Sequence, residues 1–162
     1  MTVQIDSYSY LHQLVERLPQ KPPFRFVDEI TAVSDWGISG FYTFPEDAWY
    51  YRGHFPNHPV TPGVILLEAM AQIGLVGLWL HLKQYQYSPS SDHLSGEDVV
   101  PLFADATVDF LRSIYPGTRV RVDSQKIYFR RGKLCCDVSL FDSDGQVAAR
   151  ARISGQGVNH AK

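Results

Sequence analysis

The stretch VILLEAMAQIGLVGLWLHL, residues 64 to 82, is the most apolar segment of the chain and decides how the chain folds. Its length approaches that of a membrane-spanning helix. Five residues interrupt the apolar run: Glu68, Gln72, Gly74, Gly77 and His81. We therefore expect a helix that is buried in a protein core. Because it is apolar nearly all round, such a helix needs packing partners on every side.

The segments around this helix predict β-strands. Upstream, residues 24–33 and 38–44 are rich in aromatic and β-branched residues, and Asp35-Trp36-Gly37 between them supplies a turn. Downstream, four further strands are expected at 106–114, 119–130, 133–141 and 146–154. The short turn sequences between these strands predict an antiparallel meander. The economical fold is α+β, with a curved antiparallel sheet wrapped around one long central helix.

Two further segments, a first helix and a polar loop, are predicted outside the sheet and the long helix. Asp6 or Ser7 caps a first helix that Pro19 ends, and its apolar positions recur at helical spacing: Tyr10, Leu11, Leu14, Val15 and Leu18. Residues 84–98 are polar and predict an exposed loop. We find no internal repeat or linker, so the whole chain, 1–162, is expected to be a single domain.

Charge and composition narrow the function classes. The formal net charge of −2 argues against a nucleic-acid-binding protein. Between Arg112 and Lys133 there are seven basic residues and one acid, Asp123. This run is either a positive face for an acidic partner or a set of solvated strand faces. The first residues lack a basic segment followed by an apolar one, so we expect no secretory signal and a cytoplasmic location.

Cysteine and histidine spacing argues against a metal site. Cys135 and Cys136 are sequence neighbours, which suits neither a mutual disulfide nor a zinc cluster, and we expect them to pack on alternate faces of a strand. His54 and His58 are four residues apart, but Pro56 lies between them, so their spacing is not that of ligands on a helix.

The start of the long helix has the features of an oxyanion site. In Thr61-Pro62-Gly63 we expect the Thr61 hydroxyl at the cap and the helix to begin at Pro62. The N–H groups of Gly63 and Val64 would then face outward at the positive end of the helix dipole, where a carbonyl oxygen that gains charge can bind. If the Thr61 hydroxyl bonded to one of these groups, that donor would be lost.

Glu68 and His54 are the two candidate proton carriers. Glu68 is the only charged side chain between Arg52 and Lys83 and lies about a turn and a half along the helix. A carboxyl group in apolar surroundings tends to keep its proton and suits a general acid, whereas imidazole suits a general base. The pair fits abstraction of a proton next to a carbonyl with loss of a β-hydroxyl.

The run GHFPNHPVTPGVILLEAMAQ, residues 53 to 72, resembles the signature of β-hydroxyacyl-acyl carrier protein dehydratases of the FabZ type. The similarity extends to LPQKPPFRFVDEI at 18–30, to Tyr50-Tyr51 and to Tyr115-Pro116-Gly117, and so covers about residues 18 to 155. It implies the hot-dog fold, a sheet wrapped around one long helix. This is the architecture that the strand and helix patterns predict independently.

The resemblance also implies a site and a reaction. His54 matches the catalytic histidine, Glu68 the catalytic carboxylate and Gly63 the glycine whose N–H receives the thioester carbonyl. The site is expected at a dimer interface, with the histidine from one subunit and the acid from the other. The reaction is loss of water from a 3-hydroxyacyl thioester, with no metal or organic cofactor. The acyl chain is expected in an apolar tunnel beside the helix, lined by Tyr50, Tyr51, Phe55 and Val64.

The implied partners are an acyl carrier protein and further copies or relatives of the chain. Assemblies left open are a homodimer, a larger oligomer of dimers and a heterodimer, and the pathway is fatty-acid or polyene-type chain synthesis. Thr61 stands where many members carry a bulky aliphatic residue, and Asp109 and Leu111 stand in a strand that is often basic. These departures leave carrier docking and chain length open. Glutamate rather than aspartate at position 68 favours dehydration without isomerisation.

Two other functions remain as alternatives. An acyl-thioesterase shares the fold, but such enzymes generally lack the intact HFP, PG and E motif found here at residues 54–68. A noncatalytic subunit that pairs with an active relative is the second alternative, and the presence of both His54 and Glu68 argues against it.

Overall fold

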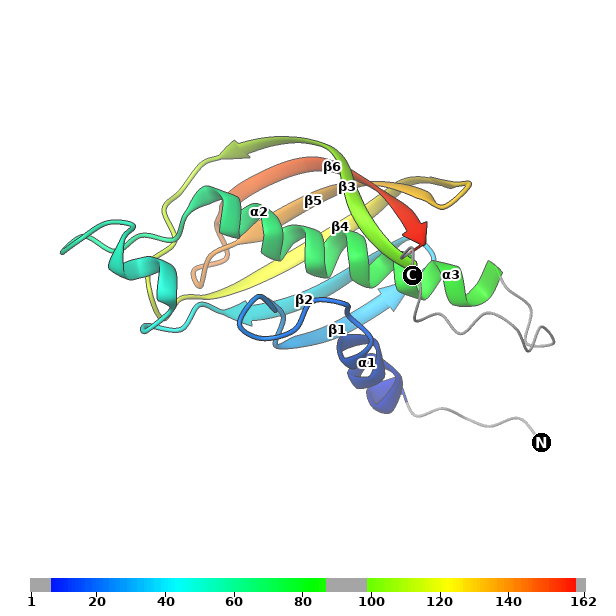
Figure 1. Ribbon diagram of the computed structural model, residues 1–162, viewed down its shortest axis with the longest axis horizontal. Coiled ribbons are helices and arrows are strands. Elements are labelled where there is room, and N and C mark those ends of the chain that lie inside the picture. The colour runs from blue at the N-terminus through cyan, green and yellow to red at the C-terminus, as the bar shows by residue number, and fades with distance from the viewer. Residues whose placement is uncertain (1–6, 87–98, 160–162) are drawn as a thin grey trace.

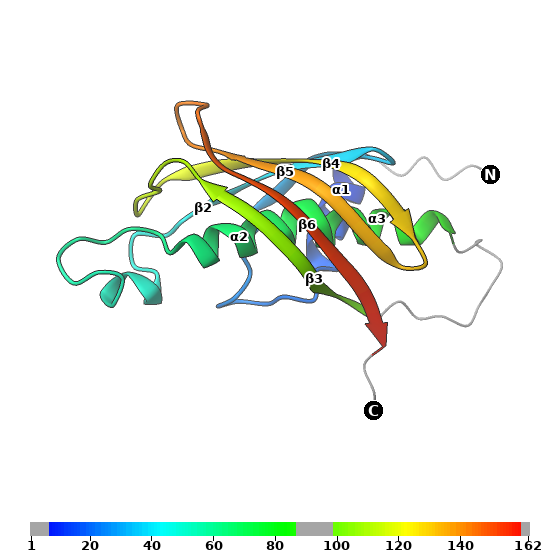
Figure 2. The same cartoon turned by 90° about the horizontal axis from the view of Figure 1, so that it is seen from above.

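The computed structural model describes residues 7–86 and 99–159, with the backbone alone for residues 85 and 86. Its centre is one continuous helix that consists of α2 (Gly63–Ala71), a π-helical segment η2 (Gln72–Gly77) and α3 (Leu78–Gln86). An antiparallel sheet wraps around this helix (Figures 1 and 2). The predicted loop at 84–98 and the candidate cap Asp6 fall largely outside the described residues.

The sheet has six strands, which in spatial order are β1 (Glu29–Ser34), β2 (Gly37–Thr43), β4 (Arg119–Arg130), β5 (Lys133–Phe141), β6 (Val147–Asn159) and β3 (Val99–Phe110). All five strand pairs are antiparallel. A first helix, α1 (Ser7–Glu16), packs beside β1, and a short 3₁₀-helix, η1 (Trp49–Arg52), lies in the loop before α2 (Figure 1).

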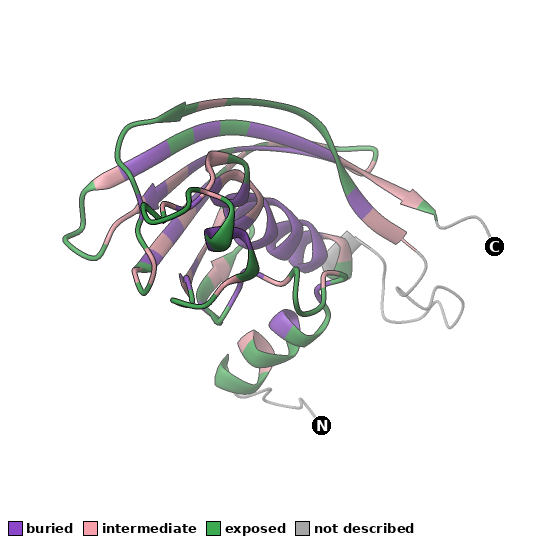
Figure 3. Cartoon of the chain, turned by 60° about the vertical axis from the view of Figure 1, so that its left-hand side comes forward, coloured by how far each residue is buried: buried purple, intermediate pink, exposed green. Residues whose placement is uncertain are grey.

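Burial explains why the helix lies inside the sheet. Along β2 and the first half of β4 every second residue is buried, as expected for strands with one face on a core. The long helix fills the concave side, and 78% of its most apolar window is buried (Figure 3). By length and composition alone the helix could cross a membrane. The prediction of a buried core helix is confirmed.

The predicted bounds of three strands were wrong, and contacts with the central helix explain two of these errors. β6 continues to Asn159 rather than 154, because Gly155 and Gly157 let the strand pass close to the helix. A Cβ atom at Gly155 would lie 2.7 Å from Leu75 Cδ2, and one at Gly157 would lie 2.4 Å from Trp79 Cζ2. These glycines therefore permit the close contact between β6 and the helix.

β3 also differs from the prediction, since it covers Val99–Phe110 rather than 106–114. Pro101 lies within it opposite Gly157. β3 is an edge strand, so the missing N–H of proline can face the open side without breaking the ladder. The strand ends early because the N–H groups of Leu111 and Arg112 both donate to the carbonyl of Ala148, which turns the chain away.

β1 begins at Glu29 rather than at residue 24. Before it, the backbone groups of Phe24 and Phe26 pair with a side chain of the helix instead of a strand. The Phe26 N–H donates to Gln72 Oε1 (2.7 Å), and Gln72 Nε2 donates to the carbonyl of Phe24 (2.9 Å). The segment between α1 and β1 is therefore attached to the central helix.

The two cysteines are free and buried, as predicted for packing residues on a strand. Both lie in β5, opposite Ser154 and Ile153 of β6. Burial raises the pKa of the Cys136 thiol to about 12, so this thiol stays protonated and unreactive.

Candidate active site

His54 lies in the loop that leads into α2 and is half-buried. Its Nδ1 lies 2.8 Å from the carbonyl oxygen of Val60, which can only accept, so Nδ1 carries the proton. The other ring nitrogen, Nε2, has no hydrogen-bond partner among the described residues and therefore presents a lone pair. The ring stacks on Phe55 at a centroid distance of 4.1 Å. This tautomer is the one that a general base needs.

The loop itself is held by backbone contacts on both sides. The His54 N–H donates to the carbonyl of Tyr50 (3.0 Å), and the Val60 N–H donates to the carbonyl of His54 (3.0 Å). At its far end the Thr61 N–H donates to the carbonyl of Ile114 (2.8 Å). The histidine therefore sits on a fixed loop next to the start of the central helix.

The helix begins at Gly63, one residue later than predicted, with Pro62 as the N-cap and no side-chain cap. The Thr61 hydroxyl is not the cap, because it is hydrogen-bonded to the Tyr51 hydroxyl at 2.6 Å, with both side chains buried. The carbonyl of Pro62 accepts from Ile65 and Leu66, and the N–H groups of Gly63 and Val64 have no partner in the described parts of the chain. Both expected oxyanion donors are present.

Gly63 is required by a contact that the sequence did not reveal. The ring of Phe110, the last residue of β3, lies directly against it. A Cβ atom at Gly63 would lie 2.9 Å from Phe110 Cζ and 3.1 Å from Cε2, closer than real Cβ contacts. Phe110 is itself about half exposed. The helix start is thus covered on one side by an aromatic ring and open on the other.

Glu68 lies on α2, partly buried, and is oriented by Gln72 one turn later. Gln72 Nε2 donates to Glu68 Oε1 at 2.9 Å. The amide orientation of Gln72 is fixed, because its Oε1 accepts from the Phe26 N–H and its other Nε2 proton goes to the Phe24 carbonyl. Oε1 of Glu68 is therefore an acceptor, so a proton that this acid gives to a substrate would have to be on Oε2. No described residue contacts Oε2 by a hydrogen bond.

The four candidate substrate-binding residues fall into two pairs. Tyr50 and Tyr51 are buried in the core on η1, and burial raises the pKa of both hydroxyls, which therefore stay neutral. Phe55 and Val64 are on the surface, and Val64 is 72% exposed. Phe55 lines an open groove of about 590 Å³ between the His54 loop and residues 113–116. Within one chain these four residues do not form one wall.

His54, Gly63 and Glu68 occupy one end of the molecule, the end where the loop projects beyond α2 (Figure 1). No hydrogen bond joins His54 to Glu68 within the described residues. Gln72 is the functional residue that sequence reasoning missed, since we counted it only as an interruption of an apolar run. The spacing in the sequence could have revealed Gln72, because an amide four residues after an acid lies on the same face of a helix.

Known proteins resemble this chain in sequence over most of its length. The sequence model of the FabA-like domain matches residues 18–152. Among curated relatives, the 3-hydroxyacyl-[acyl-carrier-protein] dehydratase FabZ of Acinetobacter baumannii is 33% identical over 149 residues, which cover 90% of this chain and 91% of the relative. The FabZ of Geotalea uraniireducens is 28% identical, with 94% and 99% of the two chains covered.

Solved structures share the fold at low sequence identity. The dehydratase heterocomplex ApeI:P from Xenorhabdus doucetiae superposes with a TM-score of 0.69 at 18% identity, covering 90% of this chain and 91% of that one. A thioesterase from Streptococcus pneumoniae, solved with coenzyme A, has a TM-score of 0.58 at 11% identity and covers 83% and 88%. These likenesses confirm the predicted hot-dog fold. The match over residues 18–152 and the FabZ relatives show that the chain belongs to the FabA-like family.

Proposed function

We propose that the chain removes water from a (3R)-3-hydroxyacyl thioester of an acyl carrier protein and so forms the trans-2-enoyl thioester in acyl-chain synthesis. The observation that carries this proposal is the tautomer of His54, whose Nδ1–H is held by Val60 and whose Nε2 is open. The relatives named as 3-hydroxyacyl-[acyl-carrier-protein] dehydratases support the same reaction.

His54 acts as the base in this reaction. Its Nε2 takes the proton from C2 of the substrate, and the electron pair of that bond moves toward the thioester carbonyl. The Val60 carbonyl continues to accept from Nδ1–H and stabilises the positive ring that forms. The loop contacts keep the ring from rotating, so the geometry is set before substrate arrives.

The N–H groups of Gly63 and Val64 receive the carbonyl oxygen as it gains charge. Both are unpaired and lie at the positive end of a helix of nine residues that continues without a break into η2 and α3. Removing one comparable donor from an oxyanion site typically costs about 10²–10³ in rate. The Thr61 hydroxyl does not compete, because Tyr51 holds it.

Glu68 supplies the proton for the leaving group. With Oε1 engaged by Gln72, the proton of the neutral acid is on Oε2, and it goes to the C3 hydroxyl as the C3–O bond breaks. One C–H and one C–O bond are lost, the C2–C3 double bond forms and water leaves. After the water leaves, His54 gives up the C2 proton and Glu68 takes up a proton through solvent, which restores both groups, and no oxidant or reductant is needed.

We further propose that each site is completed by a second copy of the chain, His54 from one copy and Glu68 from the other. β3 supports this, because this 12-residue edge strand has no described strand on its outer side. Large apolar side chains on it and next to it are about half exposed: Leu102, Phe103, Phe110 and Leu111. An open apolar edge strand is a template for pairing with another chain, and a two-fold dimer is the commonest solution.

The other edge of the sheet does not offer such a surface. β1 has six residues, an irregularity between Ile30 and Ala32, and α1 packed against it. Short, bulged and covered edges resist pairing. This difference in length and cover between the two edge strands supports β3 as the strand that pairs in the proposed dimer.

The acyl carrier protein is proposed to dock beside His54. Of the basic run 112–133, Arg119, Arg121 and Lys133 are each paired with an acid, so part of the run is a set of solvated strand faces. Arg112 is exposed without an ion pair among the described residues, and it adjoins Ser113–Tyr115 at the groove lined by Phe55. Arg52, two residues before His54, is also exposed and has no ion pair with any residue that the structure describes. An acidic carrier fits this pair of charges.

We propose that this activity is cytoplasmic. Within the described residues, the helix that is apolar enough to cross a membrane lies mostly inside the fold. The thioesterase structures share the hot-dog fold with this chain, and this likeness concerns the fold alone.

The proposal is tested with purified protein and a 3-hydroxyacyl thioester of acyl carrier protein, followed by mass spectrometry of the carrier. The expected product is lighter by one water. Glu68→Gln keeps the hydrogen bond from Gln72 but removes the acidic proton, and turnover should fall by a factor of about 10² or more. Glu46→Gln, an exposed acid in the loop before η1, is the matched control and should leave turnover unchanged.

A soluble, dimeric wild type that yields no enoyl product would exclude the dehydratase function. Full activity in Glu68→Gln would exclude Glu68 as the acid and leave the reaction itself in place.

A further inference from the structure

The connector between α1 and β1, residues 17–28, runs close to the central helix and carries contacts that no part of the proposed chemistry uses (Figure 1). On its inner side, the backbone of Phe24 and Phe26 pairs with the buried Gln72 amide. That amide uses its remaining proton on Glu68. The position of the connector is therefore coupled to the orientation of the proposed catalytic acid.

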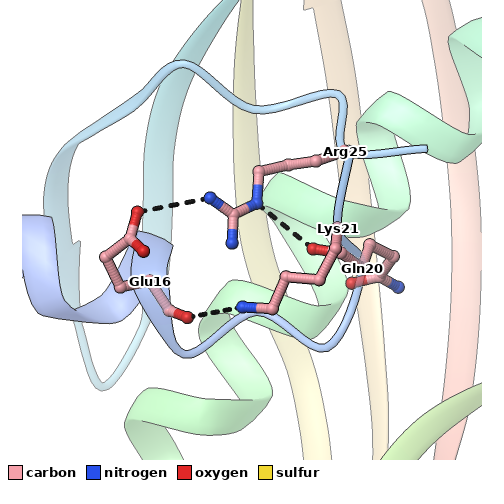
Figure 4. Close-up of polar contacts among 4 residues, drawn as sticks. All are labelled: Glu16, Gln20, Lys21 and Arg25. Carbon is pink, nitrogen blue, oxygen red and sulfur yellow. Dashed lines mark hydrogen bonds and ion pairs between the residues drawn. The ribbon is translucent and has the colours of Figure 1, made fainter. Parts of the chain in front are cut away.

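On its outer side, the same connector is tied to the end of α1 by Arg25 (Figure 4). Arg25 Nη1 donates to Glu16 Oε1 (3.2 Å), and its Nε donates to the carbonyl of Gln20 (3.2 Å). Lys21 Nζ adds a hydrogen bond to the carbonyl of Glu16 (2.9 Å). The Arg25 side chain is only 14% exposed, which is low for a charged group on a connector.

In the sequence, Arg25 lies between Phe24 and Phe26, whose backbone groups are hydrogen-bonded to the Gln72 amide. Its side chain fixes the connector from outside, and the backbone of its neighbours Phe24 and Phe26 is fixed from inside. A shift of the connector would remove an acceptor or a donor from the Gln72 amide and allow that amide to rotate. The hydrogen bond from Gln72 Nε2 to Glu68 Oε1 would then be lost. Without it, the proton that the acid gives to the substrate could be on either carboxyl oxygen.

We infer that Arg25 is a positioning residue for Glu68, which acts through the connector and Gln72 and links the end of α1 to the active site. The inference rests on the proposed function for its effect on turnover, but the coupling itself is a property of the fold. Arg25 touches no reacting atom, so its loss should affect the chemical step and leave substrate binding unchanged.

The test is Arg25→Met, which keeps the apolar stem and removes the guanidinium, with Arg17→Met as the matched control. Arg17 is an exposed arginine next to α1 that donates to Gln84 Oε1 (2.9 Å) and has no contact with the connector beyond its own backbone. Arg25→Met should lower kcat about tenfold with KM within about twofold, and Arg17→Met should change neither. Arg25→Lys, which can reach only one of the two acceptors, should give an intermediate kcat.

A double variant separates positioning from general loss of structure. If Arg25 acts through Gln72, then Arg25→Met added to Gln72→Met should cause no further loss of kcat. An equal additional loss in the Gln72→Met background would overturn the inference, as would a kcat for Arg25→Met equal to that of the wild type.

Two readouts do not depend on activity. In Arg25→Met the Phe26 amide should exchange with solvent faster, and the side-chain amide signals of Gln72 should shift in a ¹⁵N spectrum, with both unchanged in Arg17→Met. Unchanged exchange and unchanged Gln72 signals in Arg25→Met would overturn the inference. If the wild type showed no turnover, the proposed function would fail, and these two readouts would still decide the coupling.

Discussion

A histidine lies near each end of the central helix, and the two histidines differ in how their ring nitrogens are paired. His81, in α3, is buried; its Nδ1 lies 2.7 Å from the Tyr10 hydroxyl and its Nε2 lies 3.6 Å from Asp35 Oδ1. His54, before α2, has one nitrogen held by Val60 and the other open. Because His54 is only half-buried, its open Nε2 can meet a bound molecule, whereas both ring nitrogens of His81 face groups of the protein.

The groups around the two histidines also differ in whether they have partners. Near His81 the indole of Trp79 donates to the carbonyl of Gly132 (2.9 Å), and the ammonium of Lys83 lies 4.9 Å from the Trp79 ring. At the α2 end the N–H groups of Gly63 and Val64 lack partners among the described residues. One end of the helix therefore serves stability, and we propose that the other binds the substrate.

The largest expected effect separates the two histidines. His54→Ala should lower kcat by a factor of about 10³ with little change in the free energy of unfolding, because it removes the base from a half-buried loop position. His81→Ala should leave kcat within about twofold but destabilise the fold by about 1–3 kcal/mol, because it leaves a cavity and unpaired partners. Steady-state kinetics and urea unfolding measure the two effects. A loss of stability without loss of kcat in His54→Ala, together with a loss of kcat in His81→Ala, would contradict these roles.

The next effect concerns the start of the helix. Gly63→Ala should lower kcat about tenfold or more, because the new methyl group must displace the Phe110 ring from the position it holds 2.9 Å away. Phe110→Leu, made in the same chain, should restore part of the activity by giving the methyl group room. A Gly63→Ala enzyme with full activity would show that the ring can move freely.

A smaller effect belongs to the α3 end. Trp79→Phe removes the hydrogen bond to the carbonyl of Gly132 and should lower the free energy of unfolding by about 1 kcal/mol. Its kcat should equal that of the wild type, because Trp79 is at the end of the helix away from His54. A loss of kcat without loss of stability would contradict the division between the two ends.

The smallest effect is a pH dependence of stability. Burial lowers the pKa of His81 from 6.5, and Asp35 offsets part of this. Between the lowered pKa and 6.5 the unfolded state binds more protons, so the stability is fully present above pH 6.5 and falls as the pH drops below it. The loss should stay below about 1.4 kcal/mol for each unit of pKa shift. Urea unfolding at pH 7.5 and 5.0 should show a smaller loss in His81→Gln, and an equal loss would assign the dependence to other groups.

Much of the fold could be predicted from the sequence, since alternation and turn residues gave β4 and β5 with their observed bounds. The errors arose where long-range contacts override local signals. The predicted strand ended at residue 154, whereas β6 continues through Gly155 and Gly157, which allow the helix to approach. The start of β1 moved because Gln72, which lies 46 residues beyond Phe26, takes the place of a neighbouring strand.

The candidate site was predictable as a set of residues but not as a geometry. His54, Gly63 and Glu68 could be named from the motif, whereas the Val60 carbonyl and the Phe110 ring come from packing that no local pattern encodes. Thr61 was predicted at the cap, and its hydroxyl bonds to Tyr51 instead. A hydroxyl before Pro-Gly suits both arrangements, and tertiary contacts choose between them.

The central claim is that the open end of the helix becomes an active site when two copies meet. The most direct measurement is turnover by dimers that contain one His54→Ala chain and one Glu68→Gln chain, co-expressed with different tags and purified through both. Each such dimer keeps one site with both residues intact, so the activity should be about half that of the wild-type dimer, while either variant alone stays inactive. Mixed dimers without turnover, beside an active wild type, would show that His54 and Glu68 serve one site within a single chain.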